Sequence, residues 1–253
     1  MKKLALLFVA ISAWSCTGDV GFTNSDSGFE SGAPGNTGRG GSLARFTIID
    51  DFLYTVNGND LKVFQLNGAE TLPKGSITLN AFAETIFPFR NHLLIGTRTG
   101  MHIYGLENPE NPNYVSQYQH FASCDPVVAQ GNHAYVTLRN GTPCMWGQNQ
   151  LDILDISSFS NPIHRNSVQM QNPQGLAADR EKLYVCEGQN GMAIFDITDP
   201  EFPQLEDYKT EVKPFDVIAF GNKLILTGEN GISQYATNET GQLQLLSTIQ
   251  LGE

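Results

Sequence analysis

The sequence predicts an all-β fold, a five-bladed β-propeller whose blades are four-stranded antiparallel sheets. One motif recurs five times: an apolar strand, a Gly or Asn turn, a second strand, another Gly turn, and a third strand that ends in Asp or a Pro-rich turn. The copies begin 40, 41, 49 and 41 residues apart, a period typical of repeats that each form one blade and stack on their neighbours. The 25 Gly and 12 Pro residues punctuate these short strands, and no long amphipathic helix interrupts them.

The strands of each repeat, A to D, can be assigned in chain order. Strand A is expected at residues 46–49, 86–89, 127–129, 176–178 and 217–219. Strand B follows a short polar turn at 53–56, 93–96, 134–137, 183–186 and 224–227. Strand C is expected at 61–64, 101–104, 151–154, 192–195 and 232–235, and the weaker strand D at positions such as 114–118 and 245–249. These twenty strands share no blade between the chain ends, so we expect the fifth blade to close the ring by packing on the first.

The first sixteen residues predict export. Lys2 and Lys3 form a positive start, residues 4–13 are apolar but too few to span a bilayer, and small residues precede Cys16. The segment resembles a bacterial lipoprotein signal, which implies removal of residues 1–15 and acylation of Cys16, although Trp14 is bulkier than the usual residue there. An ordinary secretory signal is the alternative. Either one exports the protein, and we expect a location in the cell envelope, at the outer membrane.

Residues 16–42 are expected to form a lipid-anchored tether ahead of the propeller at residues 43–253. Their Gly, Ser, Asn, Asp and Thr residues cannot bury enough apolar surface to offset the loss of conformational entropy on folding. A flexible chain of this length reaches roughly 28 Å. The propeller should therefore stand near the membrane without a transmembrane helix.

The charge of the chain excludes one class of partner. The formal net charge is −11, and Lys and Arg are scattered without a basic run. Binding to nucleic acid through counterion release requires a basic patch, so we expect no nucleic-acid partner. The expected partner is an envelope protein or a glycan, bound by a monomer that touches the membrane only through its lipid.

The third strand carries a resemblance to a known family. Residues 151–157, followed by Ser160-Asn161-Pro162, resemble the LVIVD repeat, as do residues 192–200 and the turn at 107–112. From about Arg45 onward the chain looks like the LVIVD-repeat propeller lipoproteins of Bacteroidetes-type bacteria, which implies an exported propeller but no established reaction. Gln65 and Ala236 stand where the better copies have Asp155 and Asp196. Those two aspartates are expected to end a strand and accept N–H bonds from the following turn.

Three cysteines follow Cys16 and are expected at one end of the blades. Cys124 precedes a strand A, Cys144 lies in an enlarged loop between strands B and C of the same repeat, and Cys186 ends the next strand B. Export permits disulfides, and a Cys124–Cys144 bond would close a loop of about 20 residues, contributing roughly 3 kcal/mol. Cys186 would then be free. A metal site of three thiolates is the alternative, but no His follows at ligand spacing, so we expect no metal or other cofactor.

Polar residues recur in register at that same end, which we name the binding rim. Carboxylates and a Gln precede strand A while arginines follow strand B, an arrangement that could bind a cation, a sugar or a zwitterionic metabolite near the mouth of the central channel. Trp146 is suited to stacking on a sugar or anchoring a protein partner. A solvated rim whose charges pair locally is the alternative. The candidate residues are Glu84, Arg98, Asp125, Arg139, Trp146, Gln174, Glu187, Asp216 and Glu229.

Catalytic motifs are absent from the sequence. None of the five His residues has a Ser or Cys nucleophile at a recognisable spacing, and no phosphate loop or metalloprotease helix occurs. We therefore expect a binding or scaffolding module that uses the binding rim, with a small-ligand or carbohydrate site at the channel mouth as the alternative. A hydrolase or lyase using Asp125 and Asp216 is the third hypothesis, because a propeller site can be assembled across blades without a contiguous motif.

Overall fold

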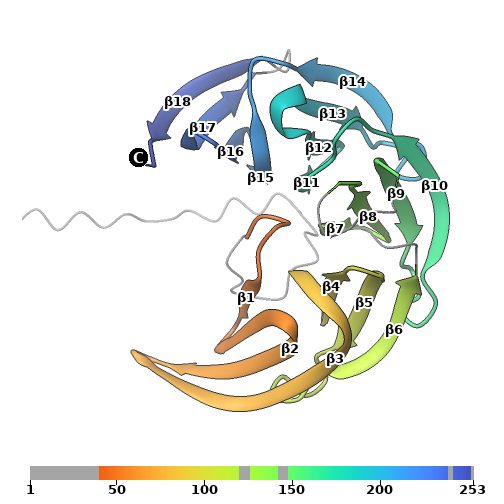
Figure 1. Cartoon of the computed structure of the whole chain (residues 1–253), viewed down its shortest axis with the longest axis vertical. Coiled ribbons are helices and arrows are strands. Elements are labelled where there is room, and N and C mark those ends of the chain that lie inside the picture. The colour runs from red at the N-terminus through yellow and green to blue at the C-terminus, as the bar shows by residue number, and fades with distance from the viewer. Residues whose placement is uncertain (1–39, 120–125, 142–147, 239–241, 252–253) are drawn as a thin grey trace, which may run out of the picture.

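The computed structural model describes residues 40–119, 126–141, 148–238 and 242–251, and shows a β-propeller (Figure 1). Within these residues the sheets stand around a central axis, with β7, β11 and β15 innermost and β6, β10, β14 and β18 at the outside. All neighbouring strands pair antiparallel. The prediction of an all-β propeller is confirmed.

The strands form four sheets. The first sheet holds β1 (Phe46–Ile49), β2 (Phe52–Asn67), β3 (Glu70–Phe89), β4 (His92–Thr97), β5 (Gly100–Gly105) and β6 (Asn113–Gln119). The second holds β7 (Val127–Gln130), β8 (His133–Leu138), β9 (Gln150–Asp155) and β10 (Ile163–Gln169). The third holds β11 (Leu176–Asp179), β12 (Lys182–Cys186), β13 (Met192–Asp196) and β14 (Gln204–Lys209), with the short helix η1 (Gly188–Asn190) after β12. The fourth holds β15 (Pro214–Phe220), β16 (Lys223–Gly228), β17 (Gly231–Thr237) and β18 (Leu243–Ile249).

The predicted count of five blades is wrong, because the first two repeats merge into one six-stranded sheet. Strand D of repeat 1 and strand A of repeat 2 are a single strand, β3, which pairs with β2 through its first half and with β4 through its second. Pro126 and Pro173 lie in the links before β7 and β11, and Pro214 is the first residue of β15, whereas residues 79–85 contain neither Gly nor Pro. Without a residue that breaks the ladder, the strand continues across the junction.

The turn between strands A and B has the same backbone conformation in every repeat. Its first residue has a positive φ: 51° at Asp50, 51° at Arg90, 58° at Gly131, 56° at Arg180 and 61° at Gly221. Left-handed backbone is disfavoured for residues with a side chain, and Gly adopts it without that cost. The five turns therefore have a similar backbone conformation at this position, although the residue there is Asp, Arg or Gly.

The core is divided into apolar clusters between adjacent units. One lies inside the first sheet, between its first and second repeats, where Tyr54 and Leu61 meet Ile95 and Leu106. Three more join the first sheet to the second, the second to the third, and the third to the fourth. In the described residues no cluster joins the fourth sheet to the first. The expected closure by direct packing of the last blade on the first is therefore absent from this core.

Candidate functional site

The structure describes seven of the nine candidate rim residues. Glu84 lies in β3 and Asp216 in β15, Gln174 precedes β11, and Arg98, Arg139, Glu187 and Glu229 directly follow β4, β8, β12 and β16. Because strand B ends where strand A begins, these positions lie at one end of the sheets. Asp125 and Trp146 lie outside the described residues, as do Cys16, Cys124 and Cys144. The predicted disulfide and lipid attachment therefore stay predictions.

Glu84 and Arg98 pair with each other. Arg98 Nε donates to Glu84 Oε1 at 2.8 Å, and the guanidinium lies 4.0 Å from the centre of the Phe82 ring. A charge-assisted hydrogen bond and a cation–π contact together hold the arginine against its own sheet. This part of the rim is a local ion pair. Such pairing is expected if the rim is simply solvated and its charges pair with each other.

Asp216 binds the start of the described chain. Ser42 Oγ donates to Asp216 Oδ1 at 3.1 Å, and the backbone N–H of Leu43 donates to Oδ2 at 3.4 Å. Ser42 Oγ also accepts the N–H of Leu176, at 2.7 Å. Burial raises the pKa of Asp216, while bonds from the backbone and from Ser42 oppose that rise. The carboxylate thus ties residues 42–43 to the third and fourth sheets, across the side where the ring lacks a packed core.

Two glycines make room for this carboxylate. A Cβ on Gly41 would lie 1.9 Å from Asp216 Oδ2, and one on Gly175 would lie 2.1 Å from Oδ1. Neither position can hold a larger residue without displacing Asp216. We name residues 41–44 and Asp216 the ring clamp, which also includes the bond from Ile86 N–H to the carbonyl of Ala44 at 2.9 Å.

Cys186 and Glu187 are both buried inside the fold. The Cys186 thiol is free and fully buried, and burial, aided by the nearby Asp216, raises its pKa well above the usual value. A buried protonated thiol is neither a good nucleophile nor a metal ligand. The Glu187 carboxylate is 1% exposed, and it accepts the N–H groups of Gln171 at 2.6 Å and Asn172 at 3.0 Å. It also accepts the hydroxyl of Tyr208, so it holds the link between the second and third sheets in place.

Glu229 lines a pocket of about 230 Å³ between the third and fourth sheets. Val212, Pro214 and Leu226 provide apolar lining, and the exposed Glu211, Lys213 and Glu229 bring charges to it. Lys213 Nζ donates to the carbonyl of Gln189 at 2.6 Å, which joins η1 to the link before β15. Sequence reasoning missed Glu211 and Lys213. The only signal for them was their place beside Pro214 at a junction between repeats.

A Ser, a His and an Asp also meet on the outside of the second sheet, but they are not a catalytic triad. Ser167 Oγ lies 2.8 Å from His164 Nε2 and donates to Asp152 Oδ1 at 2.6 Å. Asp152 lies 3.6 Å from that same Nε2, whereas a triad requires the carboxylate on the other ring nitrogen. The Ser proton is directed at the carboxylate, so the His cannot act as its general base.

Two absences concern the described residues alone. No group of three or more His, Cys, Asp or Glu side chains is placed to hold a metal ion. No helix there has the length and apolar character needed to cross a membrane.

The aspartates of the third-strand motif have the structural role that the sequence predicts. Asp155 Oδ1 accepts the N–H of Ser157 at 2.9 Å, and Asp196 Oδ1 accepts the N–H of Thr198 at 2.8 Å. Hydrogen bonds from Ser157, and then from Arg165, hold the pKa of Asp155 well below its usual range. Both carboxylates end strand C and shape the turn that follows, so the prediction is confirmed.

That C–D turn packs on the preceding repeat. Tyr54 Oη, in repeat 1, donates to the carbonyl of Pro109 in the turn of repeat 2 at 2.9 Å. Tyr135 Oη, in the second sheet, donates to the carbonyl of Pro200 in the third at 3.3 Å. Ser116 Oγ likewise donates to the carbonyl of Phe159. The Pro-rich turns of repeats 2, 3 and 4 therefore each join their repeat to the preceding one.

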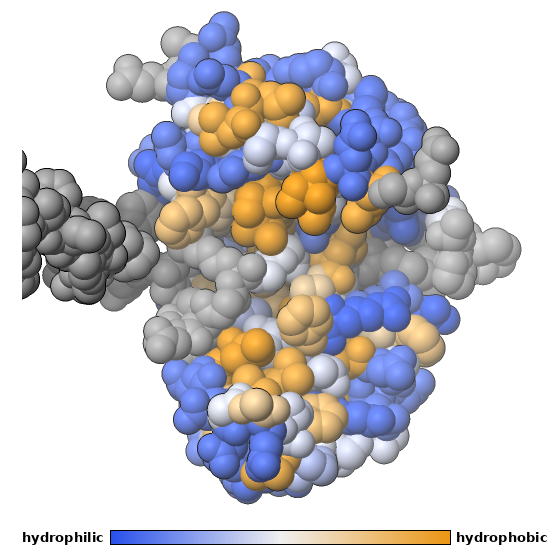
Figure 2. Space-filling view, turned by 90° about the vertical axis from the view of Figure 1, so that its left-hand side faces the viewer, coloured by the Kyte–Doolittle hydropathy of each residue, from blue (hydrophilic) through white to orange (hydrophobic). Residues whose placement is uncertain are grey.

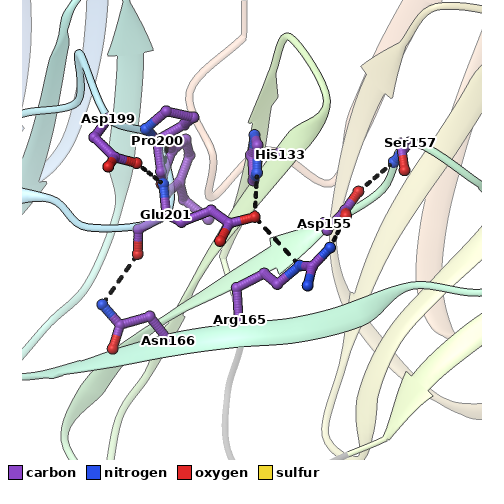
Figure 3. Close-up of polar contacts among 9 residues, drawn as sticks. His133, Asp155, Ser157, Arg165, Asn166, Asp199, Pro200 and Glu201 are labelled. Carbon is purple, nitrogen blue, oxygen red and sulfur yellow. Dashed lines mark hydrogen bonds and ion pairs between the residues drawn. The ribbon is translucent and has the colours of Figure 1, made fainter.

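Figure 3 shows the most polar of these joints, between the second and third sheets. Glu201 Oε1 lies 3.3 Å from Arg165 Nε and 3.6 Å from His133 Nε2, and Asn166 Nδ2 donates to the carbonyl of Glu201 at 3.0 Å. Arg165 also binds Asp155 at 2.5 Å, so one arginine links the end of its own strand C to the next sheet. The charges on this rim, opposite the binding rim, hold sheets together.

Residues 123–169 and 182–210 match the family model of the LVIVD repeat. The matched LVIVD repeats include all of the second sheet and most of the third, which supports the resemblance drawn from the third-strand motif. No curated protein matches the sequence.

Solved structures with the same fold are distant in sequence. A protein from Bacteroides fragilis described as a candidate 6-phosphogluconolactonase is similar with a TM-score of 0.63 at 14% identity, over 81% of this chain and 69% of that one. A protein from Lactobacillus plantarum gives 0.62 at 16% identity, over 79% and 69% of the two chains. A functionally unknown protein from Desulfotomaculum acetoxidans gives 0.61 at 12% identity, over 86% and 70%. At these identities the similarity extends to the fold alone.

Proposed function

We propose that this chain is an exported LVIVD-type propeller lipoprotein, anchored through Cys16, whose binding rim holds an envelope protein. The proposal rests on which charged residues at the rim are bonded within the chain and which are exposed. Glu84, Glu187 and Asp216 are each bonded within the chain, whereas Glu211 and Glu229 are exposed beside a pocket that Val212, Pro214 and Leu226 line together with polar residues. Apolar residues bordered by exposed charges are typical of a protein docking site.

The anchor is tested by metabolic labelling with an alkyne fatty acid. The wild-type protein should carry the label and fractionate with membranes, and Cys16→Ser should lose the label and enter the soluble envelope fraction. Cys186→Ser is the matched control, since that thiol is buried and should not be acylated. Label retained in Cys16→Ser would overturn the lipid anchor and leave the ordinary secretory signal.

The partner is tested by crosslinking in intact cells, followed by affinity purification and mass spectrometry. We expect one envelope protein to be captured reproducibly and to be lost in the double variant Trp146→Ala, Arg139→Glu. Phe202→Ser is the control, because Phe202 is exposed on the opposite rim, in the turn before β14. Capture that survives the double variant would show that the part of the binding rim around Arg139 and Trp146 is not the contact surface.

The pocket beside Glu229 favours a second function, the binding of a small polar ligand or a sugar. Its volume of about 230 Å³ accommodates a molecule the size of a monosaccharide or an amino acid. Because Asp216 binds Ser42 and Leu43, this second function places the ligand in the pocket and not at the channel mouth. A ligand from a panel of glycans and amino acids should raise the melting temperature, and Glu229→Gln should abolish the rise. A rise that persists in that variant would place the ligand elsewhere.

A hydrolase or lyase is the third possibility, and it has a direct assay. The Bacteroides fragilis neighbour is described as a candidate 6-phosphogluconolactonase, so 6-phosphogluconolactone is the substrate to try. We expect no turnover, because one of the two carboxylates proposed for catalysis, that of Asp216, binds Ser42 and Leu43. Turnover that is lost in Asp125→Asn would reverse this conclusion.

A further inference from the structure

The outer strand of the fourth sheet, β18, is more exposed than the outer strands of the other sheets. Every residue from Gln244 to Ile249 is exposed, whereas β6, β10 and β14 each contain partly buried residues. Among the described strands β18 pairs with β17 alone, so the N–H and C=O groups along its outer edge have no strand partner there. A row of such groups is a template on which another strand can pair.

The side chains of β18 are unusually apolar for an exposed strand. Leu245, Leu246 and Ile249 are 55%, 47% and 64% exposed, and Leu251, just after the strand, is 65% exposed. Figure 2 looks onto the side of the molecule on which β18 lies in Figure 1, and apolar residues gather in the upper part of this view. Each of the other outer strands has one large apolar side chain that is exposed: Tyr114 in β6, Ile163 in β10 and Leu205 in β14.

The other outer strands also have features that limit pairing, and β18 has none of them. Charged side chains protect strand edges, and β10 has Arg165 while β14 has Glu206. In β6, which has no charge, Ser116 donates to the carbonyl of Phe159 in the second sheet. Residues 243–251 contain no ionisable side chain, and no turn of another described sheet bonds to them.

The strand is already held in an extended conformation. The hydroxyls of Ser233 and Thr248 lie 3.2 Å apart, which joins β18 to β17 beyond the backbone ladder. A Cβ on Gly231 would lie 2.1 Å from the carbonyl oxygen of Ile249, so the two backbones pack closely at this end. A strand ordered in advance loses little conformational freedom when a partner pairs with it.

The occupant of such an edge must be an extended strand without charges, because alternating N–H and C=O groups are matched by another strand. The β18 strand of a second copy meets both conditions. The chain has a formal net charge of −11, so most surfaces of two copies repel each other, whereas two strands without ionisable residues do not. In any antiparallel register, uncharged residues face uncharged residues. A two-fold axis relates the two copies, and pairing uses both edges, so assembly stops at the dimer.

We infer that this protein forms a dimer in which the β18 strands of two copies pair antiparallel and join two four-stranded sheets into one. A strand of seven residues offers an edge about 24 Å long for this contact. The dimer differs from the monomer expected from the sequence. It depends neither on the binding rim nor on a lipid at Cys16.

The test places a photo-crosslinking amino acid, p-benzoylphenylalanine, at position 245 of the full exported chain in intact cells. Irradiation should give a band of twice the mass of the chain, in which mass spectrometry finds position 245 joined to residues 243–251. The matched control has the same amino acid at position 205, where Leu205 of β14 is 59% exposed. The control should give at most a fifth of that dimer.

A charge on the edge should separate the two copies. Ser247→Lys places a cation on each β18, so the dimer yield from position 245 should fall at least fivefold. The yield should return to at least half of its original value when this chain is expressed together with a Ser247→Glu chain, whose carboxylate can pair with the lysine. Leu205→Lys, on β14, should leave the yield unchanged.

Several outcomes would overturn the inference. One is a dimer yield at position 245 that is no higher than at position 205, and another is a yield that Ser247→Lys leaves unchanged. Failure of the Ser247→Glu chain to restore the yield would show that the lysine does not act on a contact between copies. Crosslinks mainly within one chain, or to a different protein, would assign the edge to another occupant. Failure of the partner capture or of the lipid labelling would leave this result unaffected, because neither experiment uses β18.

Discussion

The carboxylate of Asp216 is a residue-scale example of a rim position that serves the fold. It lies in the innermost strand of the fourth sheet and binds residues that precede it by more than 170 positions. Its bonds to Ser42 and Leu43 replace those it would make with water, which explains why it tolerates a partly buried position despite the raised pKa. A ligand would have to displace this segment before it could reach the carboxylate.

The hydroxyl of Ser42 should contribute measurably to stability. Ser42→Ala removes the bond to Asp216 and leaves the buried N–H of Leu176 without its acceptor, so we expect the free energy of unfolding to fall by about 1–3 kcal/mol. Urea unfolding followed by circular dichroism measures the change. Ser158→Ala, which removes an exposed hydroxyl bonded to Ser160, should cost less than about 0.5 kcal/mol. Equal losses in the two variants would contradict the role given to Ser42.

His102 should make the protein less stable in acid. Its ring is 3% exposed, Nδ1 has no hydrogen-bond partner among the described residues, and burial lowers its pKa below the usual 6.5. Below pH 6.5 the unfolded chain therefore binds more protons than the folded chain. The free energy of unfolding decreases as the pH is lowered, until the pH reaches the lowered pKa of His102 in the folded protein. His102→Met should flatten this slope by up to about 1.4 kcal/mol per pH unit.

The measurement is urea unfolding between pH 4 and pH 8. Above pH 7.5 the curves for wild type and His102→Met should run parallel, because the imidazole is neutral in both states there. A slope in the variant as steep as in wild type would assign the acid sensitivity to other groups, of which His92 is one, since burial also lowers its pKa.

At the scale of single elements, the A–B turn sets its own residue preference. Gly131 has a φ of 58° and no atom lies within 4 Å of where its Cβ would be, so only the backbone resists a side chain. Gly131→Ala should lower the free energy of unfolding by about 1 kcal/mol, and Gly131→Asn by less, because Asn adopts left-handed backbone more readily. Thermal unfolding of the two variants separates the effects. An equal cost for Ala and Asn would mean that the turn changes conformation.

The elements show where sequence reasoning succeeds. Strands such as β8 and β12 were predictable because an apolar run lies between two turns, and the roles of Asp155 and Asp196 followed from the short-range chemistry of a turn. The merged strand β3 was not predicted, since its signal is the absence of a breaker in residues 79–85. The pairing of Tyr135 with Pro200 joins positions 65 apart and could not be found by examining one repeat.

At the scale of the whole molecule, local patterns predict the blades but not the ring. Every repeat contains similar strands, so nothing in one repeat distinguishes an interior unit from a terminal one. The use of Asp216 in the ring clamp and the meeting of Glu211, Lys213 and Glu229 around a pocket depend on contacts between distant segments. The positions of the binding-rim residues could thus be predicted from the order of the strands. Their roles could be assigned only from the assembled structure.

Two truncations should isolate the ring clamp. A chain that begins at Arg45 loses the four bonds that Ser42, Leu43 and Ala44 make to β3 and to the third and fourth sheets, whereas one that begins at Gly40 keeps them; both lack residues 1–39. Four bonds at about 1 kcal/mol each predict a difference of about 4 kcal/mol, or roughly 8–16 °C in melting temperature for a protein of this size. Scanning calorimetry measures it. Identical melting temperatures would show that the ring does not depend on residues 41–44.

The ring clamp also imposes an order of events on the newly made chain. Ser42 leaves the ribosome early, but its partner Asp216 follows 174 residues later and Leu176 follows 134 residues later. The repeats can stack one after another as they emerge, since each cluster joins units adjacent in sequence, whereas the clamp must wait for the last sheet. A chain halted before Asp216 would keep stacked blades and an unattached N-terminus, so residues 41–44 stay open to proteases until Asp216 has been made.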